Sequence, residues 1–184
     1  MQNDHACGSC CLAVVVMVVV GIDPGLTGAI AFIKNGVPMD IVDMPVEQVE
    51  GKDARVQHRV AGLSLFYLLK DAPYDAMVVY VERVSARPSI GTRPQGAAST
   101  FSLGDSFGAV RTAVQCAKLP LHFVTPQSWK RAVGIYGADK DVSRTRATAL
   151  MPQGTHYWSR KKDHGRAEAA LIAWYGWMQQ SSSA

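Results

Sequence analysis

The feature that most constrains the fold is an uninterrupted apolar run, Leu12 to Ile22, that ends on a single carboxylate, Asp23. Its content of valine predicts a strand buried on both faces rather than an amphipathic one. The run is too short to cross a bilayer, which needs ~20 apolar residues. A side chain at the end of such a strand is rigidly held, which makes Asp23 a candidate functional carboxylate.

A second apolar strand ends in the same way. The segment AMVVYVERV is apolar from Met77 to Val81 and then reaches Glu82. If the two strands are neighbours, Asp23 and Glu82 share a site beyond the strand ends. Carboxylates that lie close together repel each other unless a cation compensates, and hard oxygen ligands suit Mg²⁺ or Mn²⁺. The alternative is that each acid only caps a turn or a helix.

A third group of polar residues opens the last apolar segment, KKDHGRAEAALIAWYG. Its alanines allow a helix to pack closely on a sheet, which would carry Glu168 towards the strand ends. Asp163 and Glu168 are five residues apart, about 140° around an ideal helix, so both face one metal only if Asp163 lies at or before the first turn. Asp163 is also a good N-cap, while His164 shares a helix face with Glu168.

The remaining pattern predicts alternating strands and helices. Two short strands, 29–36 and 37–44, meet at Asn35-Gly36, a strong hairpin signal that predicts an antiparallel meander with the first strand. A helix is expected over 54–70, with Val60, Leu63, Phe66, Tyr67 and Leu69 as its apolar positions. A loop follows Glu82, and the later elements are a helix at 97–117, a strand at 121–125, and helices at 128–133, 142–150 and from about 163.

The length of 184 residues favours a single domain. We expect a disordered extension over residues 1–11, one folded domain over 12–180 and a frayed tail over 181–184. The apolar run is not expected to be a signal peptide, because Asp4 but no lysine or arginine precedes it. Cys7, Cys10 and Cys11 lack a second ligand pair for zinc, and a reducing compartment is expected.

Charge is distributed unevenly along the chain. Residues 1–82 contain 5 lysines and arginines against 10 acids, whereas residues 83–184 contain 14 against 5. A basic half of this size predicts an anionic partner, and no basic amphipathic helix points to a membrane. Nucleic acid is therefore the expected partner, with a solvated basic surface as the alternative.

Six segments taken together resemble the RuvC-like Holliday junction resolvases, most closely their bacteriophage and chloroplast branch. They are GIDPGLTGAIAF, VYVERV, AASTFSLGDSFGAV, VTPQSWKRAVG, KDVSR and KKDHGRAEAALIAWYG, in the family's order from about Val18 to Gly176. The resemblance implies an α/β, RNase H-like fold, with a five-stranded mixed sheet in the order 3-2-1-4-5 and helices on both faces. It also implies a homodimeric crossover junction endodeoxyribonuclease that cuts opposed strands of a four-way DNA junction.

The resemblance also assigns the acids. The bacterial enzymes have their final two acids three residues apart, but here Gly165 stands three residues before Glu168. The phage and chloroplast pattern DHGRAEA points instead to Asp163. The implied cofactor is Mg²⁺, two ions per active site, with Mn²⁺ as a substitute. The implied catalytic and metal-binding residues are Asp23, Glu82, Asp163 and Glu168, with His164 as possible support.

The basic residues of the second half are candidates for tracking DNA phosphates. Trp129 and Trp158 could stack on unpaired bases, although buried tryptophans are more often part of a core. We expect four-way or branched DNA as partner, no membrane, no small-molecule substrate, and a location in the cytoplasm of a bacterial or phage-infected cell, or in an organellar nucleoid. The candidate DNA contacts are Arg87, Arg93, Lys130, Lys161, Lys162 and Arg166.

Three other functions fit parts of the pattern. GIDPGLTGAIA also resembles the phosphate-binding hairpin of the actin, Hsp70 and sugar-kinase ATPases, but those need two such domains and a second glycine-rich motif. Another RNase H-like nuclease, acting on RNA–DNA hybrids or other branched DNA, is the nearest enzyme alternative. A junction-binding protein without catalysis is the third.

Overall fold

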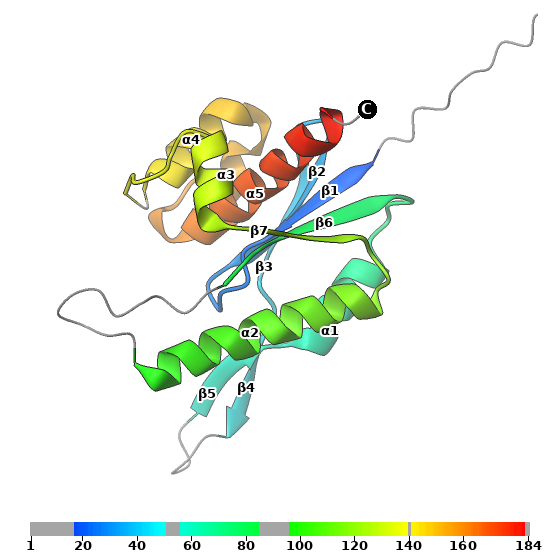
Figure 1. Cartoon of the computed structure of the whole chain (residues 1–184), viewed down its shortest axis with the longest axis vertical. Coiled ribbons are helices and arrows are strands. Elements are labelled where there is room, and N and C mark those ends of the chain that lie inside the picture. The colour runs from blue at the N-terminus through cyan, green and yellow to red at the C-terminus, as the bar shows by residue number, and fades with distance from the viewer. Residues whose placement is uncertain (1–16, 51–55, 85–95, 140, 183–184) are drawn as a thin grey trace, which may run out of the picture.

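The computed structural model describes residues 17–50, 56–84, 96–139 and 141–182, and its centre is a five-stranded mixed sheet (Figure 1). The first three strands form the expected antiparallel meander: β1 (Val18–Ile22), β2 (Ala29–Lys34) and β3 (Val37–Asp43). Then β6 (Met77–Glu82) pairs parallel with β1, and β7 (Leu121–Val124) pairs parallel with β6. The order β3-β2-β1-β6-β7 is the expected one, with a hairpin inserted before its last two strands.

The turn between β2 and β3 follows from its two residues. Asn35 and Gly36 have φ values of 52° and 75°. Two successive residues with positive φ match the twist of a tight β-hairpin, and Asn-Gly is the pair that adopts them at least cost. The hairpin expected from the sequence is therefore confirmed.

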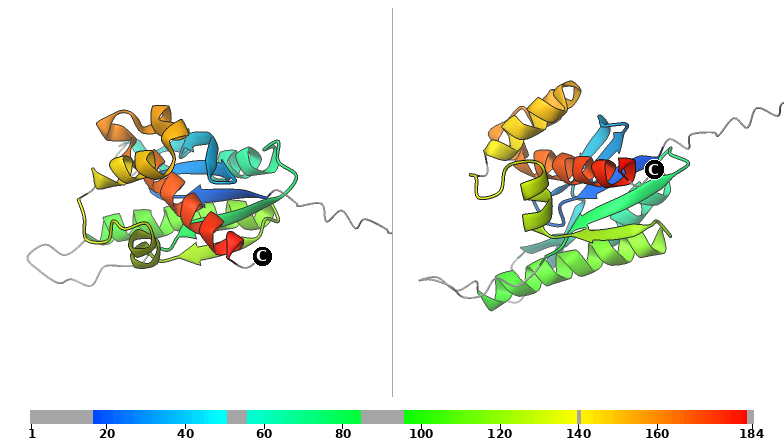
Figure 2. Two further views of the ribbon diagram at one scale, coloured as in Figure 1. Left: turned by 90° about the horizontal axis from the view of Figure 1, so that it is seen from above. Right: turned by 45° about the horizontal axis from the view of Figure 1, so that its top comes forward.

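Helices cover both faces of the sheet (Figures 1 and 2). On one face lie α1 (Gly62–Lys70) and α2 (Ala97–Cys116). On the other lie α3 (Pro126–Ala132), α4 (Val142–Leu150) and α5 (His164–Ser181). Residues of β1 alternate between them: Val18, Val20 and Ile22 belong to the core on the α1 and α2 side, and Val19 to the core on the α5 side.

The prediction of a helix over 54–70 is wrong for residues 56–60. Residues 56–60 form β5 (Val56–Val60), which pairs antiparallel with β4 (Val46–Glu50) in a separate two-stranded sheet beyond α1 and α2 (Figure 1). Val60 faces the core and Arg59 bonds to Glu47 on β4, so cross-strand pairing overrides the helical spacing. The α1 face also differs, because Leu65 and Leu69 are buried whereas Leu63 and Tyr67 are exposed.

The long helix α5 crosses β1 at a glycine. A Cβ on Gly21 would lie 2.2 Å from the Ala169 carbonyl oxygen and 2.3 Å from the Ala173 nitrogen. The helix backbone therefore rests directly on the strand backbone, which only glycine in β1 and small residues in α5 permit. This contact fixes the height of α5 above the sheet.

Two short 3-10 segments precede α5 and were not expected: η2 (Pro152–Trp158) and η3 (Lys161–Asp163). Trp129 and Trp158 are both almost completely buried, which confirms that they are core residues. Helix α5 reaches Ser181, whereas the extension at residues 1–11, with its three cysteines, lies outside the described residues. Among the helices of the described part, none has the length and apolarity to cross a membrane.

Candidate active site

Asp23 and Glu82 lie side by side at the ends of β1 and β6. The parallel register of β1 and β6 pairs Ile22 with Val81, so the next residue on each chain is an acid. Val19 and Val78 face the core under α5, and the alternation along the two strands turns both acids towards that same face. The neighbouring strand ends expected from the sequence are therefore present.

Glu168 completes a group of three acids. It lies in α5 next to Ala169, whose carbonyl group touches β1 at Gly21. Burial, followed by the charges of Glu168 and Glu82, raises the pKa of Asp23 from 3.8 to about 7. A hydrogen bond from the Gly25 amide at 3.4 Å opposes this rise. A carboxyl group perturbed by burial and by two like charges is typical of a functional site.

The other two carboxylates are held by neighbouring side chains. The indole Nε1 of Trp129 donates to Glu82 Oε2 at 2.6 Å. Glu168 Oε1 accepts hydrogen bonds from Ser143 Oγ at 3.1 Å and Lys130 Nζ at 3.3 Å. Helices α3 and α4 thus supply donors for acids on β6 and α5.

Trp129 and Ser143 bond to the acids, a role that the sequence analysis did not assign to them. Both are almost completely buried, although Ser143 is polar. The only sequence signal for Ser143 is its place in the family segment KDVSR, and Trp129 is expected from the sequence either to stack on bases or to belong to the core. Lys130 was expected to contact DNA, and here its ammonium group lies among the acids and lowers the pKa of Asp23.

The donor chemistry of the three acids fits a hard divalent cation. The three acids come from β1, β6 and α5, and burial followed by the charges of Glu168 and Glu82 raises the pKa of Asp23, a combination that a bound cation would offset. Within the described ranges, however, no three acidic, histidine or cysteine side chains lie in an arrangement that could hold a metal ion as it stands. Oxygens of Glu82 and Glu168 are instead bonded to Trp129, Ser143 and Lys130.

Asp163 belongs to a different group of charges. Its carboxylate accepts hydrogen bonds from the Arg160 backbone nitrogen at 3.0 Å and from Arg160 Nε and NH2 at 3.0 and 2.9 Å. The Arg160 guanidinium is the main reason that the pKa of Asp163 lies below its usual value. Asp163 sits at the N-cap position of α5, but its side chain bonds to no helix amide. Its role as a metal ligand stays a prediction.

The candidate basic residues have different surroundings. A shallow cavity of about 630 Å³ is lined by Asp139, Asp141, Lys161, Lys162 and His164. Lys161 Nζ lies 3.6 Å from Asp141 Oδ2, and its side chain is 84% exposed. The Arg166 guanidinium bonds to Asp43, and Arg87 and Arg93 lie outside the described residues.

Solved structures resemble this arrangement over nearly the whole chain. Thermus thermophilus RuvC gives a TM-score of 0.51 at 18% identity, covering 89% of this chain and 97% of that one. The same protein in complex with a Holliday junction substrate gives 0.53 at 16% identity, covering 90% and 96%. The chain has the fold of RuvC. The expected RNase H-like class, a mixed sheet with helices on both faces, is thus confirmed.

Two further comparisons point to the same group of proteins. The yeast mitochondrial Holliday junction resolvase Ydc2 gives a TM-score of 0.50 at 17% identity, covering 90% of this chain and 80% of that one. The chloroplastic Holliday junction resolvase MOC1 of Chlamydomonas reinhardtii is 50% identical over 46 residues. That match covers 24% of this chain and 5% of MOC1. No family model matches the chain. The expected resemblance to RuvC-like resolvases is confirmed.

The raised pKa of Asp23 predicts a pH-dependent effect of Asp23→Asn on stability. Without metal, the folded wild-type protein keeps a proton on Asp23 between pH 3.8 and about 7, where the unfolded chain has lost it. The wild type should therefore lose stability relative to Asp23→Asn as pH rises from 4 to 7, by on the order of 3 kcal/mol, and the difference should level off above pH 7.

Chemical denaturation of both proteins in EDTA at pH 4, 5.5, 7 and 8 measures this difference. Any loss of the Gly25 hydrogen bond adds an offset that does not depend on pH. The interpretation fails if the difference between the two proteins is constant across the series.

Proposed function

We propose that this protein is a metal-dependent endonuclease that resolves four-way DNA junctions by paired, symmetric nicks. The observation that carries the proposal is the convergence of Asp23, Glu82 and Glu168 from β1, β6 and α5 in a chain with the fold of RuvC. The matched RuvC is described in complex with a Holliday junction substrate, and Ydc2 and MOC1 are described as Holliday junction resolvases. These descriptions support the choice of substrate.

Asp23, Glu82 and Glu168 are the proposed ligands of Mg²⁺, or of Mn²⁺ as its substitute, and two ions per site remain the expectation. Bound divalent metal would supply an activated water and stabilise the charge that develops on the phosphate and the leaving oxygen. No nucleophilic side chain is then required. Asp163 is the fourth candidate, but its carboxylate would first have to leave Arg160.

The chain's own residues orient these acids. Trp129 fixes one oxygen of Glu82, and Ser143 and Lys130 fix one oxygen of Glu168. Lys130 also offsets the negative charge of the three acids, and its side chain is 31% exposed. Once a divalent cation takes over that role, the Lys130 ammonium can pair with a phosphate oxygen of the substrate.

The proposed DNA path runs past the active site along basic residues of the second half, including Lys161 and Lys162 at the shallow cavity. Binding through such phosphate contacts weakens steeply with salt. An RNase H-like nuclease that acts on RNA–DNA hybrids or other branched DNA remains the second candidate. The relative MOC1 is chloroplastic, which supports the organellar alternative to a cytoplasmic location.

The central prediction is selective, metal-dependent cutting. In Mg²⁺ or Mn²⁺ the protein should nick a synthetic four-way junction at symmetric positions and leave linear duplex and RNA–DNA hybrid largely intact. Asp23→Asn or Glu82→Gln should lower the rate on the order of 100-fold or more, because each removes a metal-binding charge. Junction binding should survive in both variants, because repulsion of phosphate falls.

Gel assays on the three substrates, with and without metal, measure the cutting. Equal cutting of junction and duplex would leave a general nuclease, and cutting of the hybrid alone would favour the second candidate. Near wild-type activity in Asp23→Asn would show that the group of three acids is not the catalytic centre.

The fourth ligand is tested by comparing two acids of the same segment. Glu168→Gln should raise the Mg²⁺ concentration for half-maximal cutting about tenfold or more, since Glu168 is one of the three converging acids. If the Asp163 carboxylate keeps its bonds to Arg160 when metal binds, Asp163→Asn should leave that concentration within about twofold. Its effect should be a lower melting temperature of a few degrees. A tenfold rise for Asp163→Asn would instead make Asp163 a ligand.

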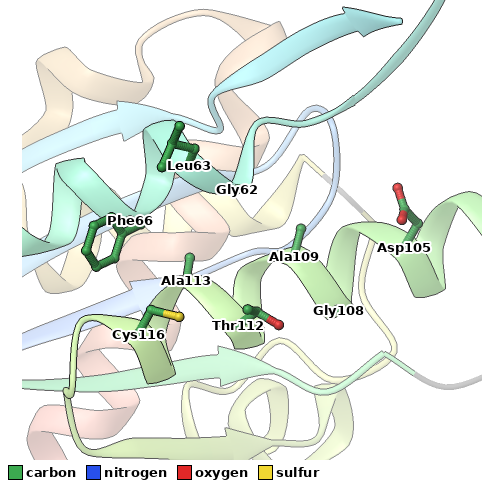
Figure 3. Close-up of a pocket in the computed structure, with 9 residues that line it drawn as sticks. All are labelled: Gly62, Leu63, Phe66, Asp105, Gly108, Ala109, Thr112, Ala113 and Cys116. Atoms are coloured by element: carbon green, nitrogen blue, oxygen red, sulfur yellow. The ribbon is translucent and has the colours of Figure 1, made fainter.

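Symmetric nicking requires two active sites, and the α1 and α2 side of the protein offers a surface for a second copy. An apolar groove of about 630 Å³ lies between these helices, and Figure 3 shows the residues that line it. Leu63 and Phe66 line it from α1, and Ala109, Thr112 and Cys116 are among the residues from α2. Leu63 is 69% exposed, so a large apolar side chain stands uncovered at its edge.

The groove is self-complementary along α2. Phe101 is 77% exposed and lies on the helix face that lines the groove, one turn before Asp105. Gly108 and Ala109 lie midway between Phe101 and Cys116, so a two-fold axis there would place Phe101 of each copy at the Cys116 end of the other groove. A Cβ on Gly108 would meet nothing within 4 Å, so a second helix can approach closely.

We therefore propose that the homodimer forms through α2 and the α1 edge. Phe101→Asp should shift the protein from dimer to monomer and abolish the pairing of the two nicks, because a charge cannot enter an apolar groove without a partner. Sedimentation equilibrium measures the mass. Met39→Asp is the matched control, because Met39 is also a large exposed apolar residue, at 46%, but lies on the edge strand β3. A Phe101→Asp protein that stays dimeric would place the interface elsewhere.

A further inference from the structure

Arg166 ties α5 both to β3, 123 residues away in the sequence, and to the nearby segment η2. Its Nε and Nη2 donate to the two carboxylate oxygens of Asp43, at 2.6 and 2.7 Å, in a bidentate pair. Its NH1 donates to the carbonyl oxygen of Tyr157 at 3.3 Å. Arg166 lies in the first turn of α5, Asp43 ends β3, and Tyr157 belongs to η2. One side chain therefore fixes the start of α5 to the sheet and to the segment before it.

Asp43 belongs to the same end of the sheet as Asp23. It pairs with Ala29 across β2 and β3, and the amide of the next residue, Met44, donates to the Gly28 carbonyl at 3.0 Å. Ala29 in turn accepts a hydrogen bond from the Asp23 amide at 3.1 Å. A short series of backbone bonds therefore connects Asp43 to the backbone of Asp23.

The first turn of α5 rests on this region with no side chain between them. A Cβ on Gly165 would lie 2.2 Å from the Thr27 carbonyl oxygen and 3.2 Å from the Gly28 Cα. Glu168 follows Gly165 by three residues, close to one helical turn. The position of the Glu168 carboxylate relative to Asp23 thus depends on how firmly this turn is held against residues 27 and 28.

We propose that Arg166 is a positioning residue: its bidentate pair with Asp43 holds the first turn of α5 against the sheet and so sets the spacing between Glu168 and Asp23. This inference rests on the proposed function and replaces the expectation that Arg166 contacts DNA. The Arg166 side chain is only 23% exposed, and three of its nitrogens already donate to protein oxygens. A DNA phosphate would have to displace the Asp43 carboxylate.

Arg166→Lys separates the two roles, because lysine keeps the positive charge but cannot form a bidentate pair in the same geometry. A positioning role predicts that Arg166→Lys and Asp43→Asn each raise the Kd for Mn²⁺ about fivefold to tenfold and lower the single-turnover rate similarly. Junction affinity in EDTA and its salt dependence should stay unchanged. The double variant should be no worse than either single one, because both changes remove the same pair.

Arg59→Lys is the matched control, because Arg59 forms an exposed pair with Glu47 on the β4 and β5 hairpin. It should change neither Mn²⁺ binding nor the rate. Isothermal titration with Mn²⁺ and filter binding of the junction are made well below the lowest melting temperature of the set, so that all the proteins are folded.

A phosphate contact gives the opposite pattern and would overturn the inference. Arg166→Lys would then resemble wild type, Arg166→Gln would weaken junction binding and lower the salt slope by about 1, and Asp43→Asn would not weaken binding. Additive losses in the double variant would also overturn it. If the wild type binds Mn²⁺ but cuts no junction, the proposed function fails while the Mn²⁺ affinities of the variants still test the positioning role.

Discussion

The contact on which the candidate site depends is the approach of α5 to β1 at Gly21. The backbones of helix and strand touch there, with Ala169 and Ala173 of the helix lying over the glycine. Backbone atoms, which cannot rotate away, set the height of the helix above the strand. Glu168, the residue before Ala169, is therefore held close to the end of β1, where Asp23 follows. The spacing of the acids in the candidate site therefore depends on the lack of a side chain at Gly21. A larger residue at Gly21 would collide with the backbone of α5 and push Glu168 away from Asp23.

The second constraint is electrostatic. A buried carboxylate beside two other acids destabilises the folded state, and the pKa of Asp23 is raised first by burial and then by the charges of Glu168 and Glu82. Trp129, Ser143 and Lys130 reduce this cost by hydrogen bonds to Glu82 and Glu168, and the charge of Lys130 also lowers the pKa of Asp23. The Asp23 side chain accepts a long hydrogen bond, 3.4 Å, from the Gly25 amide. The protein thus retains unbalanced negative charge at one place, which is the property that a cation-binding site needs.

Most of the sheet could be predicted from the sequence because its signals are local. The apolar runs before Asp23 and Glu82, and the Asn35-Gly36 turn, each specify their own structure. The hairpin of β4 and β5 could not be predicted, because Val60 fits a helical spacing as well as a strand and only pairing with β4 decides. The partners of Glu82 and Asp163 were also missed, because Trp129 and Arg160 meet them through the folded chain. Contacts of this kind leave no periodic trace in the sequence.

The alternation of β1 between two cores has a consequence for how such chains can change in length. Val18 and Val20 face one core and Val19 the other, so one residue inserted within β1 would exchange the two faces and turn Asp23 away from Glu168. The connection between β3 and β6 has no such restriction, and it holds a whole additional hairpin without disturbing the sheet order. Insertions are thus tolerated in the connection between β3 and β6 but not within β1. Chains of different length can therefore keep the same arrangement of acids.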